Sequence, residues 1–388
     1  MAGERVGELL GKFRERYQAG DKAMRSGVLD ELCRLAGYHR KYAISLLGRR
    51  EEKTRTKTVR RRGVTYSAQT LRVVEAVWEA AGYPWSERLA AMLPQWLPWA
   101  RKHVAGVTDE VIAQARRISA RQIDRRLRTR KVKMKRRIYG RTKPGALLKH
   151  QIPVKTDHWD VGGPGYTEID LVSHSGPNAS GEFIHSLNVT DIHTGWCETR
   201  ALMGKGEAGV VAALEEVRRA LPFRLLAIDS DNGSEFINHH LVRYCKKHRI
   251  QFTRGRPYKK DDNAHIEQKN WTHVRRIFGW DRYDTREQQD AMNTLYRGDL
   301  RTMMDLFQPC VKLESKTRVG PKLQRHYDAA RTPLNRLMQT KNGAINTIAL
   351  NTLRAQHEST DPFALSHAIE RQLTTLEQLR KKTKKRAA

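Results

Sequence analysis

The chain has 388 residues, 39% of them hydrophobic, which is enough for two or three domains that each bury a core. Lys and Arg outnumber Asp and Glu by 73 to 42, and the resulting net charge of +31 predicts a polyanionic partner, most simply nucleic acid. No apolar run approaches the roughly 18 residues that span a bilayer, no signal-peptide core is recognisable, and scattered cysteines argue against disulfides, so we expect a soluble cytoplasmic protein.

Residues 1–50 are expected to be helical, because apolar residues recur at helical spacing over residues 6–17. A short helix, a turn at residues 36–38 and a basic second helix beginning near Arg40 and Lys41 make a helix-turn-helix pattern. A helical hairpin without any DNA-reading role fits the same pattern. Both interpretations stay open, with Arg40 and Lys41 as the candidate DNA contacts.

Residues 51–63 have no apolar periodicity and are expected to form a basic linker. A second helical unit is predicted over residues 64–130. Its last part resembles another turn and recognition helix, with Ser119 as the N-cap and with Ile123 and Leu127 facing inward. The outward-facing cations of this helix, and candidate DNA contacts, are Arg121, Arg125 and Arg128.

Positive charge is densest in residues 101–150, which hold 17 Lys or Arg against 3 Asp or Glu, a net of +14. A charge run is usually only a solvated surface, but this one is too one-sided to be balanced by ion pairs. Each cation that neutralises a phosphate releases counterions and gains affinity. We therefore interpret residues 131–155 as a basic linker that follows DNA. Its candidate contacts are Lys131, Lys133, Lys135, Arg136 and Arg137.

Residues 156–284 have a different sequence pattern, which predicts strands first and then helices alternating with strands. Apolar runs predict three successive strands between residues 167 and 202, joined by Gly-rich connections, which indicates an antiparallel meander. Helix, strand, helix, strand and helix then alternate up to residue 278. This order predicts a mixed α/β layer arrangement.

Residues 285–388 are expected to be mostly helical and to serve DNA binding or assembly. The stretch 312–338 is rich in turn-forming residues and cations. An apolar stripe from Leu365 to Leu376 either covers the core or pairs with another subunit. The basic end, KKTKKRAA, is expected to be disordered. The predicted fold is thus multidomain, with N-terminal all-α helix-turn-helix domains, an α/β core and a mostly helical C-terminal region.

Three acidic residues stand at informative places. Asp170 lies inside the first strand of the core, Asp231 ends the fourth strand before an Asn-Gly turn, and Glu267 lies early in a helix. Three converging carboxylates repel one another unless a cation lies between them. Mg²⁺ prefers oxygen ligands, and two such ions about 4 Å apart can serve an in-line displacement at phosphorus. The three acids are therefore the predicted catalytic residues and metal ligands.

The segments TEIDLV, DSDNGSEF and RPYKKDDNAHIEQKN, in this order, resemble the DDE catalytic core of retroviral integrases and integrase-like insertion-sequence transposases. That core has an RNase H-like fold, expected here over residues 156–284. The family's Asp, Asp and Glu fall on Asp170, Asp231 and Glu267, with 35 residues between the last two, the spacing typical of the family. Asp229 is the rival second acid, but only Asp231 directly precedes Asn-Gly and gives this spacing. The helical units and PYKKDDNAHIEQKNW further resemble ISNCY-type transposases.

The resemblance implies a DNA transposase that binds transposon ends and uses two Mg²⁺ ions, or Mn²⁺ in their place, for phosphodiester hydrolysis and strand transfer. It also implies terminal inverted repeats and target DNA as double-stranded partners, a dimer or larger homo-oligomer on DNA, and a place on the bacterial nucleoid rather than a membrane. Lys269 and Arg275, close to Glu267, are further expected DNA contacts, whereas Asn263 and His265 either cap the helix or contact DNA or water. A catalytically inactive DNA-binding regulator and a simple metal-dependent nuclease are the alternatives.

Overall fold

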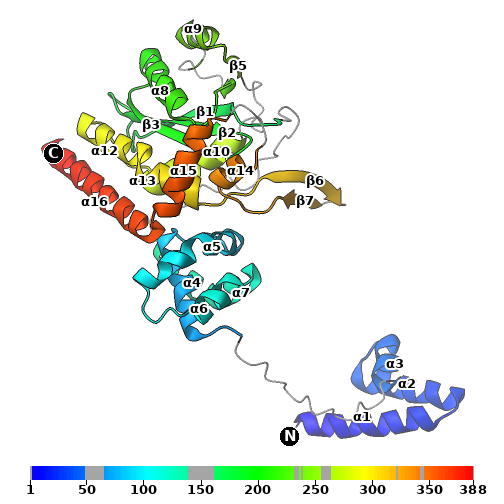
Figure 1. Cartoon of the computed structure of the whole chain (residues 1–388). Helices are drawn as coiled ribbons and strands as arrows, with labels where there is room; N and C mark the ends of the chain where they lie inside the picture. Colours follow the sequence, from blue (N-terminus) through cyan, green and yellow to red (C-terminus); the bar gives the residue numbers. More distant parts are fainter. Residues whose placement is uncertain are drawn as a thin grey trace. The chain divides into compact units, whose positions relative to one another are not determined.

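The structure, a computed structural model, describes residues 2–48, 65–138, 161–230, 236, 239–254, 264–319, 322–340 and 345–387. The chain divides into two compact units, residues 1–63 and 64–388 (Figure 1). The segment expected to be a basic linker, residues 51–63, lies outside the described residues.

The first unit is a small helical cluster with its own core. Its helices are α1 (Ala2–Ala19), α2 (Lys22–Ala36) and α3 (Arg40–Gly48). The Asp21 side chain accepts a hydrogen bond from the Met24 backbone N–H (2.8 Å) and caps α2, which ends at Gly37 in the left-handed conformation (φ 66°). The buried core comprises Phe13, Val28, Leu29, Leu32, Ala43 and Leu47. Whether α2 and α3 read DNA stays a prediction.

The second unit begins with a helical bundle. Its helices are α4 (Ala68–Ala80), α5 (Ser86–His103), α6 (Asp109–Arg116) and α7 (Ala120–Ile138). The Ser119 hydroxyl accepts a hydrogen bond from the Gln122 backbone N–H (3.4 Å), as expected for an N-cap, and Ile123 and Leu127 are buried. Helix α7 continues through residues 131–138, which we expected to be linker. Lys, Arg and Met are good helix formers, so a charge run does not by itself end a helix.

Five strands of the second unit form one mixed sheet in the order β3-β2-β1-β4-β5. They are β1 (Tyr166–Ser173), β2 (Ile184–Asp191), β3 (Cys197–Met203), β4 (Ala227–Ser230) and β5 (Gln251–Arg254). Strands β1, β2 and β3 are an antiparallel meander, and β4 and β5 run parallel to β1. The predicted α/β core with an RNase H-like mixed sheet is thereby confirmed.

Helices pack on this sheet, and one of them was expected to lie elsewhere. They are α8 (Glu207–Ala220), α9 (His239–His248), α10 (Ala264–Lys269), the π-helical segment η3 (Asn270–Arg275), α11 (Arg276–Phe278) and α12 (Arg286–Arg297). In α12, the Asn293 side chain accepts a hydrogen bond from the Ala201 N–H and donates one to the Ala201 carbonyl (2.8 and 2.9 Å). Helix α12 therefore covers β3, although we had assigned it to the C-terminal region.

The remaining elements are α13 (Asp299–Thr302), the π-helical η4 (Met303–Phe307), β6 (Leu313–Val319), β7 (Lys322–Tyr327), α14 (Pro333–Gln339), α15 (Thr347–Ser359) and α16 (Pro362–Ala387). Strands β6 and β7 form an antiparallel ribbon in a region that we expected to be mostly helical. In α16, Leu365 and Leu376 are buried, so the apolar stripe covers the core. Among the described residues, no helix combines the length and apolar character needed to cross a membrane.

The helical bundle and the five-stranded sheet share one hydrophobic core. Trp96 of α5 is fully buried, and its ring meets those of Phe307 and Phe363 edge to face (centroids 6.4 and 5.1 Å apart). The Gln308 side chain also donates a hydrogen bond to the Ala81 carbonyl (2.8 Å). The second helical unit is therefore part of the same folded body as the sheet.

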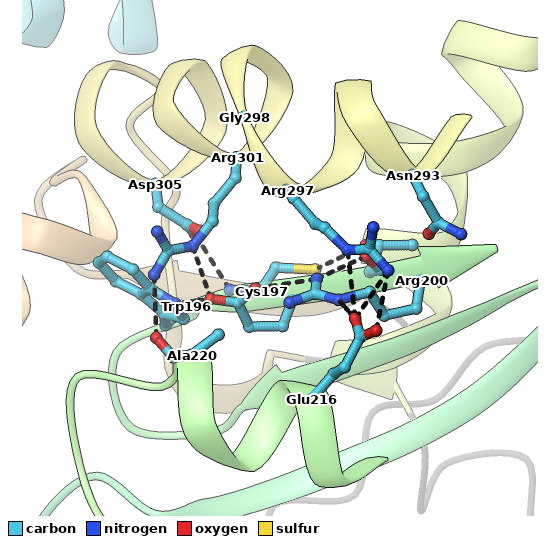
Figure 2. A network of polar contacts seen from close by, with 12 residues as sticks. Trp196, Cys197, Arg200, Glu216, Ala220, Asn293, Arg297, Gly298, Arg301 and Asp305 are labelled. Carbon is cyan, nitrogen blue, oxygen red and sulfur yellow. Dashed lines mark hydrogen bonds and ion pairs between the residues drawn. The ribbon is translucent and has the colours of Figure 1, made fainter. Parts of the chain in front are cut away.

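An ionic network with a buried centre joins α8, α12 and α13 to β3 (Figure 2). Glu198 on β3 is 0% exposed, and its carboxylate accepts hydrogen bonds from Arg301 (2.6 Å) and Trp196 (3.2 Å). Arg297 and Arg200 both bind Glu216 of α8. Because a buried carboxylate is costly unless it is paired, these contacts specify how the layers meet.

Candidate active site

Asp170 lies on β1, the central strand of the sheet, and is partly buried. One carboxylate oxygen accepts a hydrogen bond from the Asn270 side-chain amide (2.6 Å), and the other accepts one from the Leu171 backbone N–H (2.8 Å). The carboxylate is thus held both by its own strand and by the helical segment that follows α10. On the adjacent strand β2, the residue paired with Asp170 is Asn188.

The helix that carries Glu267 docks on the same strand. Glu168 lies two residues before Asp170, so the two side chains share one face of β1. Glu168 is 2% exposed, and its carboxylate accepts a hydrogen bond from the Ile266 backbone N–H (2.8 Å) at the start of α10. A carboxylate at this end of a helix is favoured by the unpaired N–H groups and the helix dipole.

Glu267 and Asn270 are three residues apart and therefore lie on one side of the helix. Because Asn270 bonds Asp170, the side of the helix that bears Glu267 is the side that meets β1. Glu267 itself is exposed. The structure therefore brings the strand with the first predicted acid into contact with the helix that carries the last one.

The sequence did not predict the chain of hydrogen-bonded polar side chains that leads from Asp170 through Asn270 into the sheet. The Asn188 amide donates a hydrogen bond to the Asn270 side-chain oxygen (2.9 Å), and the Cys197 thiol donates one to the Asn188 oxygen (2.8 Å). Asn188 and Cys197 are buried. The available signals were a polar residue one turn after Glu267 and an Asn inside an otherwise buried strand.

Asp231 lies outside the described residues. Strand β4 ends at Ser230, which pairs with Ile169, the neighbour of Asp170. The rival acid Asp229 is buried and accepts a hydrogen bond from the Thr253 hydroxyl of β5 (2.7 Å). Within the described ranges, which omit Asp231, no group of three His, Cys, Asp or Glu residues is arranged to hold a metal ion.

The cations predicted on α3 and α7 are mostly at the surface. Arg40 forms an ion pair with Asp30, and Lys41 is exposed. Lys131 pairs with Asp124 of the same helix. Arg121, Arg125 and Arg128 of α7 are exposed, as predicted. Helix α7 also includes Lys133, Lys135, Arg136 and Arg137, whose side chains lie outside the described set.

Lys269 is not where a DNA contact would be. Only 8% of it is exposed, and it lies near Cys197, His273 and Asp305, whose ionisation it influences. Burial raises the pKa of Asp305 to about 8 and that of the Cys197 thiol to about 12, and the Lys269 ammonium opposes both shifts. The expected DNA contact of Lys269 is wrong because this residue, one turn before the buried His273, lies on the side of the helix that faces the interior.

Arg275 is partly buried and lies over the exposed ring of Trp280, with the guanidinium carbon 4.0 Å from the ring centroid. Burial lowers the pKa of this guanidinium, which remains charged near neutral pH. Its position at the end of the helix that bears Glu267 is compatible with the predicted contact, which stays a prediction. Asn263 lies outside the described residues, as does the His265 side chain.

The sheet and the two acid-bearing elements define an integrase-type core, and comparison with known families agrees. Residues 163–260 match the family described as "Integrase core domain". A protein of Sinorhizobium fredii (strain NBRC 101917 / NGR234), named "Uncharacterized protein y4rM", is 34% identical over 331 residues, which cover 85% of this chain and 94% of that protein. The chain belongs to the same family as this rhizobial protein.

Solved structures of retroviral proteins are similar in part. The BIV integrase catalytic core is 14% identical, with a TM-score of 0.32, over 46% of this chain and 97% of that one. The HTLV-2 integrase core in complex with magnesium is 12% identical, with a TM-score of 0.29, over 38% and 90%. A chain of the simian T-cell lymphotropic virus intasome in complex with PP2A regulatory subunit B56 gamma is 15% identical, with a TM-score of 0.32, over 41% of this chain. The match spans 54% of that intasome chain. Such low scores assign no residue role or activity to this chain.

Proposed function

We propose that the protein is a DNA transposase, which binds the ends of a mobile element, cleaves them and joins them to target DNA. The integrase core domain and the net charge of +31 support this function. The observation that carries it is the 2.6 Å hydrogen bond from Asn270 to Asp170. This bond ties the strand of one predicted acid to the helix face of another.

The donor groups fit a divalent cation. Asp170 and Glu267 offer carboxylate oxygens, the ligands that Mg²⁺ prefers, and Asp231 would add a third carboxylate. The Asp170 carboxylate accepts hydrogen bonds from the Asn270 amide and the Leu171 backbone N–H, and Glu267 is exposed. When bound, Mg²⁺ or Mn²⁺ would stabilise the negative charge that develops around phosphorus and favour the ionised form of the attacking oxygen.

The proposed chemistry has two in-line displacements. In the first, a water oxygen bonds to phosphorus, the bond from phosphorus to the 3′ oxygen breaks, and the element end becomes a 3′-hydroxyl. In the second, this 3′ oxygen attacks a target phosphodiester and displaces the target's own 3′ oxygen. Asn270 would hold the Asp170 carboxylate in one orientation through both steps, and Glu168 would hold the helix of Glu267 against β1.

The test is a strand-transfer assay with the DNA that flanks the gene, in Mg²⁺ and in Mn²⁺. Wild-type protein should produce joined products, whereas Asp170→Asn, Asp231→Asn and Glu267→Gln should bind the ends without cutting them. Asp290→Asn, an exposed acid on α12, is the matched control and should remain active. Cleavage retained by any of the three acid variants would contradict its assignment.

The same assay separates the alternatives. Nicked but unjoined DNA would indicate a simple nuclease, and bound but uncut DNA would indicate a regulator with an inactive core. Because two ends must be joined together, the proposal also requires a dimer or larger assembly on DNA. Light scattering of the protein with and without end DNA measures this assembly.

A further inference from the structure

The β6–β7 ribbon carries an unbalanced positive charge. Between residues 315 and 327 the sequence has four Lys or Arg and no Asp or Glu. The four cations are Lys316, Arg318, Lys322 and Arg325. The register sets Lys316 directly opposite Arg325, and like charges at opposed positions of a sheet are destabilising. We call this segment the basic ribbon.

The described cations of the basic ribbon differ from several other arginines of the C-terminal part. Arg318 and Arg325 are exposed, and among the described residues neither takes part in an ion pair. Three arginines elsewhere in this part are paired: Arg336 with Asp328, Arg354 with Glu358 and Arg380 with Glu377. The charges of Arg318 and Arg325 are therefore available to another molecule.

The root of the ribbon is anchored to the catalytic core. The Lys312 and Asp328 backbones and the Asp328 carboxylate exchange hydrogen bonds (2.6 and 2.9 Å). The Lys312 ammonium donates a hydrogen bond to the His193 carbonyl (2.7 Å) in the turn between β2 and β3. The Arg336 side chain, 8% exposed, forms an ion pair with Asp328. These contacts fix the base of the ribbon relative to the sheet that carries Asp170.

Beyond its root the ribbon stands away from the rest of the unit. Within the described residues, neither β6 nor β7 packs extensively on any other helix or strand. Figure 1 shows the two strands projecting side by side. A lone two-stranded hairpin is only marginally stable in water. A partner that covers the basic ribbon would therefore stabilise it as well as neutralise it.

We propose that the basic ribbon is a DNA arm, which lies in the major groove of DNA held at the active site. The major groove of B-DNA is about 12 Å wide and admits a two-stranded β-ribbon. Strands of 7 and 6 residues span about 20 Å, enough to cross the groove. The cations contact phosphates, and Thr317 and Gln324, exposed and paired in register, offer hydrogen-bonding groups to base edges.

A second copy of the chain is a poorer occupant for this surface. Edge-to-edge pairing of two basic ribbons would bring together two chains of formal charge +31 at segments that each carry four cations. Contact with DNA removes the repulsion instead, because each neutralised phosphate releases counterions. Charge complementarity therefore selects DNA.

The test measures how salt affects DNA binding by the full-length chain. Wild-type protein and a variant carrying Lys316→Gln, Arg318→Gln, Lys322→Gln and Arg325→Gln are titrated with fluorescent double-stranded DNA at several NaCl concentrations. Each lost phosphate contact lowers the slope of log K against log salt by about 0.9, so the slope should fall by about 3 to 4. Affinity near physiological salt should fall at least about tenfold.

A charge-preserving variant is the matched control: Lys316→Arg, Arg318→Lys, Lys322→Arg and Arg325→Lys should keep the wild-type slope. Thermal unfolding of both variants should match the wild type, since Arg318 and Arg325 are exposed and all four positions lie on the two-stranded ribbon. An unchanged slope in the folded neutral variant overturns the proposal. So does lost self-association, measured by sedimentation, with DNA binding unchanged.

This inference rests on the proposed function only for the identity of the polymer. If wild-type protein joins no DNA but the slope of log K against log salt falls in the neutral variant, the DNA arm is supported and the proposed strand transfer is contradicted. If wild-type protein joins DNA and the neutral variant binds like it, the DNA arm fails and the proposed function stands.

Discussion

The two helical units at the start of the chain have similar sequence patterns but are built differently. The first, residues 2–48, closes on a small core of its own around Leu32. The second, residues 65–138, buries Trp96 in a core that it shares with the five-stranded sheet. A helix-turn-helix pattern thus does not tell whether a unit folds alone or as part of a larger body.

The shared core is accompanied by contacts between the second bundle and the helix that bears Glu267. Arg276, which follows the π-helical segment of the Glu267 helix, donates a hydrogen bond to the Gly82 carbonyl of the bundle. Arg88 of α5 donates one to the Pro309 carbonyl, and its charge acts on the buried His273. The second bundle is therefore coupled to the helix that bears Glu267. We expect the two helical units to respond differently to mutation.

The largest effect should come from Trp96→Ala. The indole is fully buried between Phe307 and Phe363, so the substitution should lower the free energy of unfolding of the second unit by about 3–5 kcal/mol. Denaturant titration followed by near-UV circular dichroism measures this loss. Trp85→Ala, at the 53% exposed N-cap position that precedes the same helix, is the control. Equal losses in both variants would show that the shared core is not what holds the bundle.

Leu32→Ala should act on the first unit alone. Its side chain is 2% exposed, and its removal should cost about 2–4 kcal/mol. Hydrogen exchange resolved by segment should speed up in residues 2–48 and stay unchanged in residues 65–138. Leu35→Ala, at a 67% exposed position of the same helix, is the control. Faster exchange in both units would contradict their independence.

The dependence of stability on pH should also differ between the units. Burial raises the pKa of Asp305 from 3.8 to about 8, so this side chain stays protonated in the folded protein while the unfolded chain ionises. Its stabilising contribution is complete below about pH 4 and is lost as pH rises to about 8, by up to about 1.4 kcal/mol per pH unit.

Asp305→Asn should remove this contribution. Denaturant titrations between about pH 5 and pH 8 should then show a flatter dependence for the second unit, with no change in the first. Asp290→Asn, on the exposed side of α12, serves as the control. The same steep dependence in wild type and Asp305→Asn would mean that another group is responsible.

The smallest change in stability is expected for Arg40→Ala in the first unit. The ion pair with Asp30 is at the surface, with side chains 44% and 55% exposed, so its loss should cost less than about 1 kcal/mol. If α3 contacts DNA through Arg40, the salt slope of DNA binding should fall by about 1. Asp30→Ala breaks the same ion pair but keeps the cation, and should not weaken binding. An equal loss of DNA binding in both variants would show that Arg40 acts through the ion pair and not by contacting DNA.

Much of the core could be predicted from short stretches of sequence. Apolar runs predicted β1, β2 and β3, and the amphipathic period predicted α8 and the inward side of α7. The position of Asp170 within a strand followed from the same patterns. The orientation of Lys269 could not be predicted in this way. In a polar helix, the sequence around a cation close to an acid does not indicate which side of the helix is buried.

The β6–β7 ribbon and the role of α12 were missed for a related reason. The ribbon's strands have few apolar residues and several cations, so no apolar run marks them, and it is the backbone pairing across the hairpin that makes them strands. Helix α12 has an amphipathic pattern that any layer could use. Its place on β3 depends on Asn293 reaching Ala201, which is 92 residues away in the chain.

The sequence alone determined the charge of this protein, the order and type of its central elements, and the candidates Asp170, Asp231 and Glu267. Only the tertiary structure decided that Asn270 holds Asp170, across 100 residues of sequence, and that one helical bundle shares the core while the other does not. The reason is physical: periodicity and charge act over a few residues, whereas the choice of neighbours comes from the packing of the whole body.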